Sequence, residues 1–209
     1  MLAELLSLVA PPRCALCAGE CGARARLCER CESRLGGASP RSIAVAGLDA
    51  GWSAASYEGV ARELIIALKF GARPGLAGRA AAAIAAGAPA ELLEGAIVPV
   101  PPAPWRRRWR GFDAAEAIAA ALGQRTELRV WPCLRRSEGR RQVGRPRGER
   151  LADPPRVRVE SAPPDKAILV DDVVTTGATL GSCARALRGR GSQAVVALTF
   201  ARSADVRLE

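Results

Sequence analysis

One segment limits the folds open to this chain more than any other: residues 168–180, which read ILVDDVVTTGATL. The segment begins as an apolar run, passes through the acidic pair Asp171 and Asp172, and ends in a turn rich in threonine ahead of a helix-forming stretch. A strand too apolar to lie at an exposed edge, followed at once by a turn into a helix, is typical of a parallel sheet covered on both faces. The segment therefore predicts an α/β fold.

Other segments alternate between the strand and helix patterns. The expected strands are 96–100, 167–170 and 194–200, and the expected helices are 60–70, 76–86, 114–122 and 178–188. This alternation predicts a mostly parallel sheet flanked by helices. We expect a linker or a loosely paired strand over 36–51, where Gly, Ala and Ser are frequent, and a long mobile loop over 135–164, where Arg, Gly and Pro are frequent.

Five of the seven cysteines lie within residues 14–31. Cys14 and Cys17 form one CxxC pair, and Cys28 and Cys31 form a second pair ten residues later. Two such pairs at this separation are typical of a tetrahedral four-thiolate zinc site. We predict a small structural zinc ribbon, because so short a segment cannot bury enough apolar surface to fold without a metal.

Redox chemistry is the alternative to metal binding for the paired cysteines. Redox chemistry normally uses a single CxxC motif at the start of a helix, so two pairs favour metal binding. Cys21 could be a spare thiol or an alternative ligand. Cys133 and Cys183 stand alone in the sequence, and we expect ordinary packing for both.

The charge balance suggests an anionic partner but does not identify it. The chain has 31 Lys and Arg against 21 Asp and Glu, and Lys69 and Lys166 are its two lysines. A basic surface attracts phosphorylated metabolites, nucleic acids or anionic lipid, although a bias toward arginine codons would give the same excess. The chain has no histidine, which excludes Ser-His-Asp and Cys-His catalysis and every histidine-containing metal site.

The sequence predicts neither membrane insertion nor secretion. No apolar run reaches the roughly 20 residues that a bilayer crossing needs. Residues 1–12 lack a basic stretch and include Glu4, so we expect a short amphipathic helix there and not a signal peptide. We therefore expect a cytoplasmic protein whose cysteines are more suited to metal than to disulfides.

The turn after the acidic pair has the features of a phosphate site. The start of a helix offers unpaired N–H groups and the positive end of the helix dipole, glycine allows a close approach, and threonine hydroxyls add donors. The expected substrate-binding residues here are Val173, Thr175, Thr176, Gly177, Ala178 and Thr179. Asp171 and Asp172, the expected catalytic residues, can accept hydrogen bonds from vicinal ribose hydroxyls or orient a Mg²⁺ chelated by a sugar and a pyrophosphate. Neither a P-loop nor a Rossmann glycine motif is present.

This segment resembles the loop of type I phosphoribosyltransferases that binds phosphoribosyl pyrophosphate (PRPP). With the four-cysteine ribbon ahead of it, the chain resembles the ComF (GntX-like) family, whose members join a zinc ribbon to a phosphoribosyltransferase domain. Residues 68–70 resemble the family's LKF motif, and residues 98–101 with 110–112 resemble its PVP…RGFN motif. Gln142, followed by Arg150, resembles the Q…R pattern of its flexible loop.

The resemblance implies a helix and zinc ribbon over 1–38 and a phosphoribosyltransferase-like domain over 39–209. It implies a 5-phosphate cradle at 175–179, ribose ligands at Asp171 and Asp172, and a pyrophosphate loop at 101–111. Arg110, Gly111 and Gln142 would be further substrate-binding residues. The implied activity is Mg²⁺-dependent pentosyl transfer with release of pyrophosphate, and the implied role is in competence and DNA uptake.

Two departures from the family pattern keep an alternative open. Asp113 and Ala114 stand where the family has Asn-Gln, and Ala152 and Asp153 stand where it has Asn near the end of the flexible loop. These changes favour a non-catalytic protein that binds PRPP or single-stranded DNA. The arginines of 105–110 and 135–150 could close over a pyrophosphate, contact single-stranded DNA beside two tryptophans, or remain solvated. A DNA-processing protein and a second copy of the chain also stay open as partners.

Overall fold

The computed structural model describes residues 12–22, 26–36, 41–70, 73–103, 112–137 and 155–203. Its centre is a five-stranded sheet in the order β1-β2-β7-β6-β3. The strands are β1 (Arg41–Ser42), β2 (Ala50–Ser56), β3 (Ala96–Pro99), β6 (Lys166–Val174) and β7 (Ala194–Arg202). Neighbouring strands are parallel except for β1, which pairs antiparallel with β2. The predicted α/β fold with a mostly parallel sheet is confirmed.

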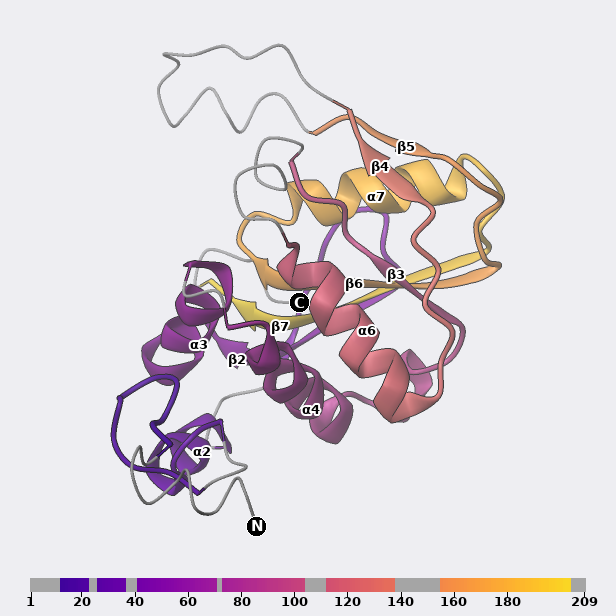
Figure 1. Ribbon diagram of the computed structural model, residues 1–209. Coiled ribbons are helices and arrows are strands. Elements are labelled where there is room, and N and C mark those ends of the chain that lie inside the picture. The colour runs from indigo at the N-terminus through magenta and orange to yellow at the C-terminus, as the bar shows by residue number, and fades with distance from the viewer. Residues whose placement is uncertain are drawn as a thin grey trace.

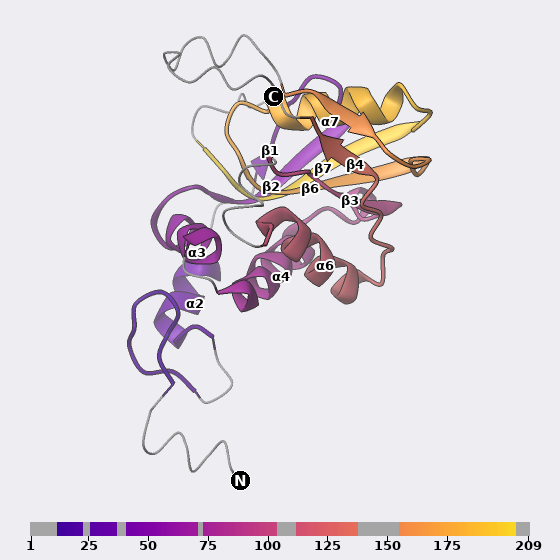
Figure 2. The ribbon, with the colours of Figure 1, turned by 45° about the horizontal axis from the view of Figure 1, so that its top comes forward.

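Helices cover both faces of this sheet (Figures 1 and 2). The helices are α2 (Glu29–Gly36), α3 (Gly59–Phe70), α4 (Ala77–Gly87), α6 (Ala114–Thr126) and α7 (Ala178–Arg188), with short 3₁₀ turns at Pro74–Leu76 and Ala90–Leu92. Helices α3, α4 and α6 lie on one side, and α7 lies on the other beneath a two-stranded ribbon of β4 (Leu134–Arg136) and β5 (Val157–Val159). Among the described helices, none combines the length and apolar character that a bilayer crossing requires.

Strand β6 shows why the sheet needs two covered faces. Ile168 and Val170 belong to the buried cluster on the α4 and α6 side, whereas Ala167 and Leu169 belong to the cluster beneath α7. Successive strand residues point to opposite faces, so an unbroken apolar run is buried only when both faces are covered. The same alternation sends the next two residues of β6 to opposite sides.

The structure corrects three expectations. Strand β6 continues to Val174 because β7 pairs with it as far as Arg202, so the acidic pair lies inside the strand and not after it. Strand β2 was not predicted from its small residues, since its burial depends on partners far along the chain. The expected loop over 135–164 contains part of β4 and all of β5, which pair antiparallel.

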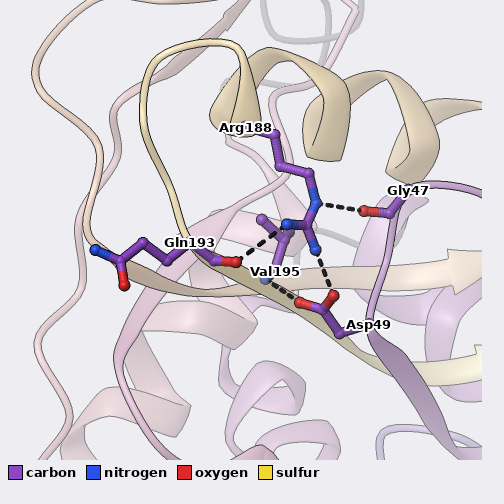
Figure 3. Close-up of polar contacts among 5 residues, drawn as sticks. All are labelled: Gly47, Asp49, Arg188, Gln193 and Val195. Atoms are coloured by element: carbon purple, nitrogen blue, oxygen red, sulfur yellow. Dashed lines mark hydrogen bonds and ion pairs between the residues drawn. The ribbon is translucent and has the colours of Figure 1, made fainter.

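A cluster of polar contacts fastens the amino-terminal end of the sheet (Figure 3). The Arg188 guanidinium, at the end of α7, donates to the carbonyls of Gly47 and Gln193, each at 3.1 Å, and pairs with the carboxylate of Asp49. Asp49 also accepts a hydrogen bond of 2.8 Å from the Val195 N–H. One arginine thus joins the loop before β2, the loop before β7 and the end of α7.

Candidate functional site

The chain topology opens a crevice at the carboxyl ends of β3 and β6. Strand β3 leads to α6 on one face of the sheet, whereas β6 leads to α7 on the other face. The Val100 N–H donates to the Val170 carbonyl. Pairing stops there because Pro102, the next residue whose nitrogen would face β6, has no N–H, while β6 runs on to Val174. Open α/β sheets bind ligands at such a point, where the helices that follow two neighbouring strands diverge to opposite faces.

A cavity of about 390 Å³ lies at this point. Its walls come from the ends of β2, β3 and β6, from the last turn of α3, from the first turns of α6 and α7, and from β4. The lining residues are Tyr57, Lys69, Val100, Pro101, Pro102, Ala103, Asp113, Ala114, Ala115, Arg136, Asp171, Asp172, Val173, Thr175 and Thr179. The volume falls within the range of about 300–1,000 Å³ that is usual for small-molecule sites.

Lys69 and Asp172 form an ion pair in the cavity wall. The Lys69 ammonium lies 2.8 Å from each carboxylate oxygen of Asp172, and the two side chains are 19% and 9% exposed. Lys69 belongs to the last turn of α3, where the helix dipole favours a positive charge. The pair joins two elements that are 103 residues apart in the sequence.

The carboxyl group of Asp171 lies in an environment that disfavours its charged form. Burial raises the pKa of the Asp171 carboxyl well above its ordinary value, and the charge of Asp172 raises it further. The Lys69 ammonium and the Asp172 N–H, which donates to Asp171 at 2.8 Å, oppose that rise. Asp171 also raises the pKa of the Cys183 thiol of α7, after the larger effect of burial, which agrees with a side chain directed toward α7.

A third carboxylate, Asp113, reaches the cavity from α6. It is the N-cap of that helix, and its side chain accepts a hydrogen bond of 2.9 Å from the Glu116 N–H. Burial raises the pKa of the Asp113 carboxyl, the Glu116 N–H opposes the rise, and the charge of Asp172 adds to it. Three carboxylates on two elements therefore influence one another across the cavity.

The threonine-rich turn leads from β6 into α7. Thr175 and Thr179 line the cavity, whereas Thr176 is exposed and its hydroxyl accepts a long hydrogen bond of 3.4 Å from Ala178. Gly177 is the N-cap of α7 with a φ of 73°, and a Cβ there would lie 2.6 Å from the Val45 side chain. Both the backbone conformation and the space therefore require glycine.

Four cysteines come together in the segment ahead of the sheet. The Sγ atoms of Cys14, Cys17, Cys28 and Cys31 lie within 4.8 Å of one another, and those of Cys17 and Cys28 are 3.6 Å apart. A tetrahedral zinc ion with Zn–S bonds of about 2.3 Å needs sulfurs about 3.8 Å apart. The group can therefore hold a metal ion, as predicted, and its all-sulfur ligand set suits structural zinc.

The electrostatics of these thiols also suit a cation. Burial and the neighbouring thiols raise the pKa of Cys31 to about 12. For Cys14 burial acts in the same direction, but N–H groups of Cys17, Cys28 and Leu16 outweigh it and lower the pKa to about 6. Four thiolates are thus unfavourable together without a positive charge between them, and a bound zinc ion would supply that charge and cross-link the two CxxC turns.

The other cysteines lie outside this group. The Cys21 thiol donates to the Pro12 carbonyl at 3.4 Å, and the four-sulfur group does not include it. Cys133 and Cys183 are buried in the core cluster beneath α7.

Some of the residues that line the cavity were predicted from the sequence, and others were not. The acidic pair, Val173, Thr175 and Thr179 line it, and Gly177 shapes the turn, whereas Arg110, Gly111 and Gln142 lie outside the described residues. The polar lining residues that were not among the expected catalytic or substrate-binding residues are Tyr57, Lys69, Asp113 and Arg136. In the sequence, Lys69 belongs to the segment that resembles the LKF motif, Asp113 is a departure from the family pattern, and Arg136 is one of the arginines that could close over a pyrophosphate.

We compared the chain with protein-family models and with curated proteins. No protein-family model matches the chain. No curated protein matches its sequence at a significant level.

Proposed function

We propose that this chain binds PRPP in the cavity and transfers its pentosyl group to an acceptor, releasing pyrophosphate. One observation carries the proposal: two adjacent carboxylates and the threonine-lined start of a helix share a cavity at the diverging ends of β3 and β6. Carboxylates suit sugar hydroxyls, and a helix start suits a phosphate, so together they suit a ribose phosphate. The resemblance to the ComF family and to type I phosphoribosyltransferases supports the same reading.

In this proposal the 5-phosphate lies at the start of α7. Thr175 and Thr179 donate hydroxyl hydrogens to it, and Gly177 lets the backbone approach. Asp171 and Asp172 accept hydrogen bonds from the two ribose hydroxyls. The same carboxylates would hold Mg²⁺, which would offset the charge of the pyrophosphate.

The reaction breaks the bond between C1 of the ribose and the pyrophosphate oxygen, which keeps the electron pair. The lone pair of an acceptor nitrogen forms the new bond to C1, and the nitrogen then loses a proton to solvent or to a cavity carboxylate. Positive charge develops on the ribose ring between these steps, and nearby carboxylates stabilise it. Positioning and charge supply the catalysis, so the absence of histidine from the chain is no obstacle.

A second candidate, binding without transfer, has its own supporting observation. Asp113 lines the cavity and caps the start of α6 by accepting a hydrogen bond from the Glu116 N–H. A carboxylate at that helix start occupies donors that a pyrophosphate could otherwise use and repels its charge. A PRPP- or single-stranded-DNA-binding protein with a role in competence, the function that the family resemblance implies, fits this arrangement.

Calorimetric titration with PRPP and Mg²⁺ tests the proposal. The zinc-loaded wild type should bind saturably, and Asp171→Asn/Asp172→Asn should lose binding. Asp165→Asn is the matched control, because this exposed acid lies just before the start of β6, at the other end of the sheet. No binding to the wild type would contradict the proposal.

A separate assay of pyrophosphate release distinguishes pentosyl transfer from binding alone. Pyrophosphate release with an amine or nucleobase acceptor supports transfer over simple binding. PRPP binding with no release across such acceptors favours the binding protein. Steep salt dependence of binding to single-stranded DNA would point to nucleic acid as its ligand.

A further inference from the structure

The described residues 12–22 and 26–36, here named the four-cysteine module, lie against α3, whose last turn lines the cavity through Lys69. Cys14, Leu27, Cys31 and Leu35 belong to the same buried cluster as the inner residues of α3 and α4. Helix α2 of the module contacts α3 directly. The module therefore shares the main core of the protein and is not a separate appendage.

Polar contacts join the module to the chain that follows α3. The Arg73 guanidinium, three residues beyond α3, donates to the carbonyl of Ala15, which lies between Cys14 and Cys17. Glu32, which follows Cys31, forms an ion pair of 2.9 Å with Arg79 of α4. Each contact uses a residue next to a metal-ligating cysteine.

The module also lies close to the turn that follows α3. The turn Pro74–Leu76 passes so close to the module that a Cβ on Gly75 would lie 2.9 Å from the guanidinium carbon of Arg26. This turn follows α3 closely in the chain and contacts it. Lys69 lies in the last turn of α3, and its ammonium contacts the carboxylate of Asp172.

We propose that the four-cysteine module is a brace for the cavity: its metal holds the end of α3, so that Lys69 stays on Asp172 and ligand affinity depends on metal occupancy. Lys69 is thus a positioning residue that acts through Asp172. The inference rests on the proposed function for its ligand. Its mechanical part, the dependence of α3 on the metal, stands on the contacts above.

A two-by-two comparison tests the brace. PRPP with Mg²⁺ is titrated into wild type and Lys69→Met, each zinc-loaded and after zinc removal by a chelator. Removal of zinc should weaken binding to the wild type about tenfold, a usual size for coupling between two sites. Zinc-loaded Lys69→Met should already bind PRPP weakly. Removal of zinc should lower its affinity by less than about a further twofold, because the contact with Asp172 through which the metal acts is already absent. Equal losses in both proteins would overturn the inference.

Variants that retain the zinc ion distinguish a loss of bracing from a general unfolding of the protein. Arg73→Met leaves all four cysteines in place and should retain one zinc ion per chain while losing several-fold in affinity. Arg62→Met, an exposed arginine near the start of α3, is the matched control and should change neither. Lys69→Arg keeps a cation beside Asp172 and should recover most of the affinity that Lys69→Met loses. Failure of Lys69→Arg to recover more than Lys69→Met would contradict a role for the charge.

Hydrogen exchange gives a readout that needs no ligand. Amides of 64–70 should exchange faster after zinc removal, while the central residues of β6 and β7 stay protected. If the loaded wild type fails to bind PRPP, the proposed function fails, and the exchange data still judge the brace. If PRPP binds but zinc removal alters neither affinity nor exchange in 64–70, the brace is wrong and the proposed function stands.

Discussion

The two ends of the sheet carry charged residues for different purposes. At the amino-terminal end, the Asp49 carboxylate has a guanidinium partner and a backbone N–H, and Arg188 divides its hydrogen bonds among three acceptors. At the carboxyl end, three carboxylates face one cavity, and Lys69 pairs with Asp172. Matched charges hold loops together, whereas burial, and after it the charge of Asp172, raises the pKa of Asp171 and of Asp113. Folding alone gives no reason to keep such crowding, which is typical of ligand sites.

Asp172→Asn should give the largest effect and distinguish the roles of the two ends of the sheet most clearly. We expect about a 100-fold loss of PRPP affinity, equivalent to about 2.7 kcal/mol, because a ribose ligand and the partner of Lys69 are both lost. Asp49→Asn should leave affinity unchanged while lowering the free energy of unfolding. Calorimetry and urea denaturation of both variants measure these outcomes, and equal affinity losses would abolish the distinction.

Gly177 and Gly191 both have a positive φ and lie at opposite ends of the sheet, so their substitution compares the two ends. Gly177→Ala should cost about 2–3 kcal/mol of unfolding free energy and also weaken PRPP binding, because the new methyl group meets Val45 as well as an unfavourable φ. Gly191→Ala has the same kind of φ, 109°, but nothing within 4 Å of its Cβ, so about 1 kcal/mol and no change in affinity is expected. Urea denaturation beside calorimetry checks both; a weaker effect at Gly177 than at Gly191 would contradict the packing argument.

Arg188→Met should have a smaller effect, confined to stability. The side chains of Arg188 and Asp49 are 35% and 49% exposed, so solvent screens the pair and the expected loss is about 1 kcal/mol. Thermal unfolding measures it, with Arg190→Met as the exposed control on the same turn. A PRPP affinity that fell together with stability would show that the two ends are not independent.

The smallest effect is a pH dependence with opposite signs in two measurements. The folded-state pKa of Asp171 is raised, so the folded chain holds its proton longer than the unfolded chain. Unfolding free energy should therefore fall as the pH rises from the ordinary value of 3.8 through the raised pKa, and Asp171→Asn should flatten that fall. Ligand affinity should rise over the same interval, because ribose hydroxyls need the ionised carboxylate. Parallel trends in the two measurements would rule out this role for Asp171.

The fold was predictable where the pattern is local. Helices α3 and α7 and strands β3 and β6 follow from apolar spacing and turn residues within each segment. Strand β2 was missed because AGWSAAS has little apolar pattern, and its burial comes from β7 and from the fit of Trp52 beneath Gly87 of α4. Strands β4 and β5 were missed because their arginine-rich sequence hides a pairing that is set by α7 beneath them.

The residues of the candidate site were likewise predictable only where their pattern is local. The acidic pair and the threonine-rich turn are contiguous, so their chemistry can be read from thirteen successive letters. Lys69 and Asp113 enter the site only through tertiary contacts, and no local pattern distinguishes them from a solvated charge and a helix cap. The four cysteines are the intermediate case, since their spacing alone predicts the group that the structure brings together.

The strand order has a consequence for how the chain reaches this state. Strand β7 lies between β2 and β6, yet it is the last strand that the structure describes. Until it arrives, β2 and β6 each present an open edge, and the sheet exists only as two separate fragments. Partners so distant in sequence favour slow, late closure. A nascent chain held before residue 194 would therefore carry both aggregation-prone edges, and chaperone dependence during synthesis should be greatest at that length.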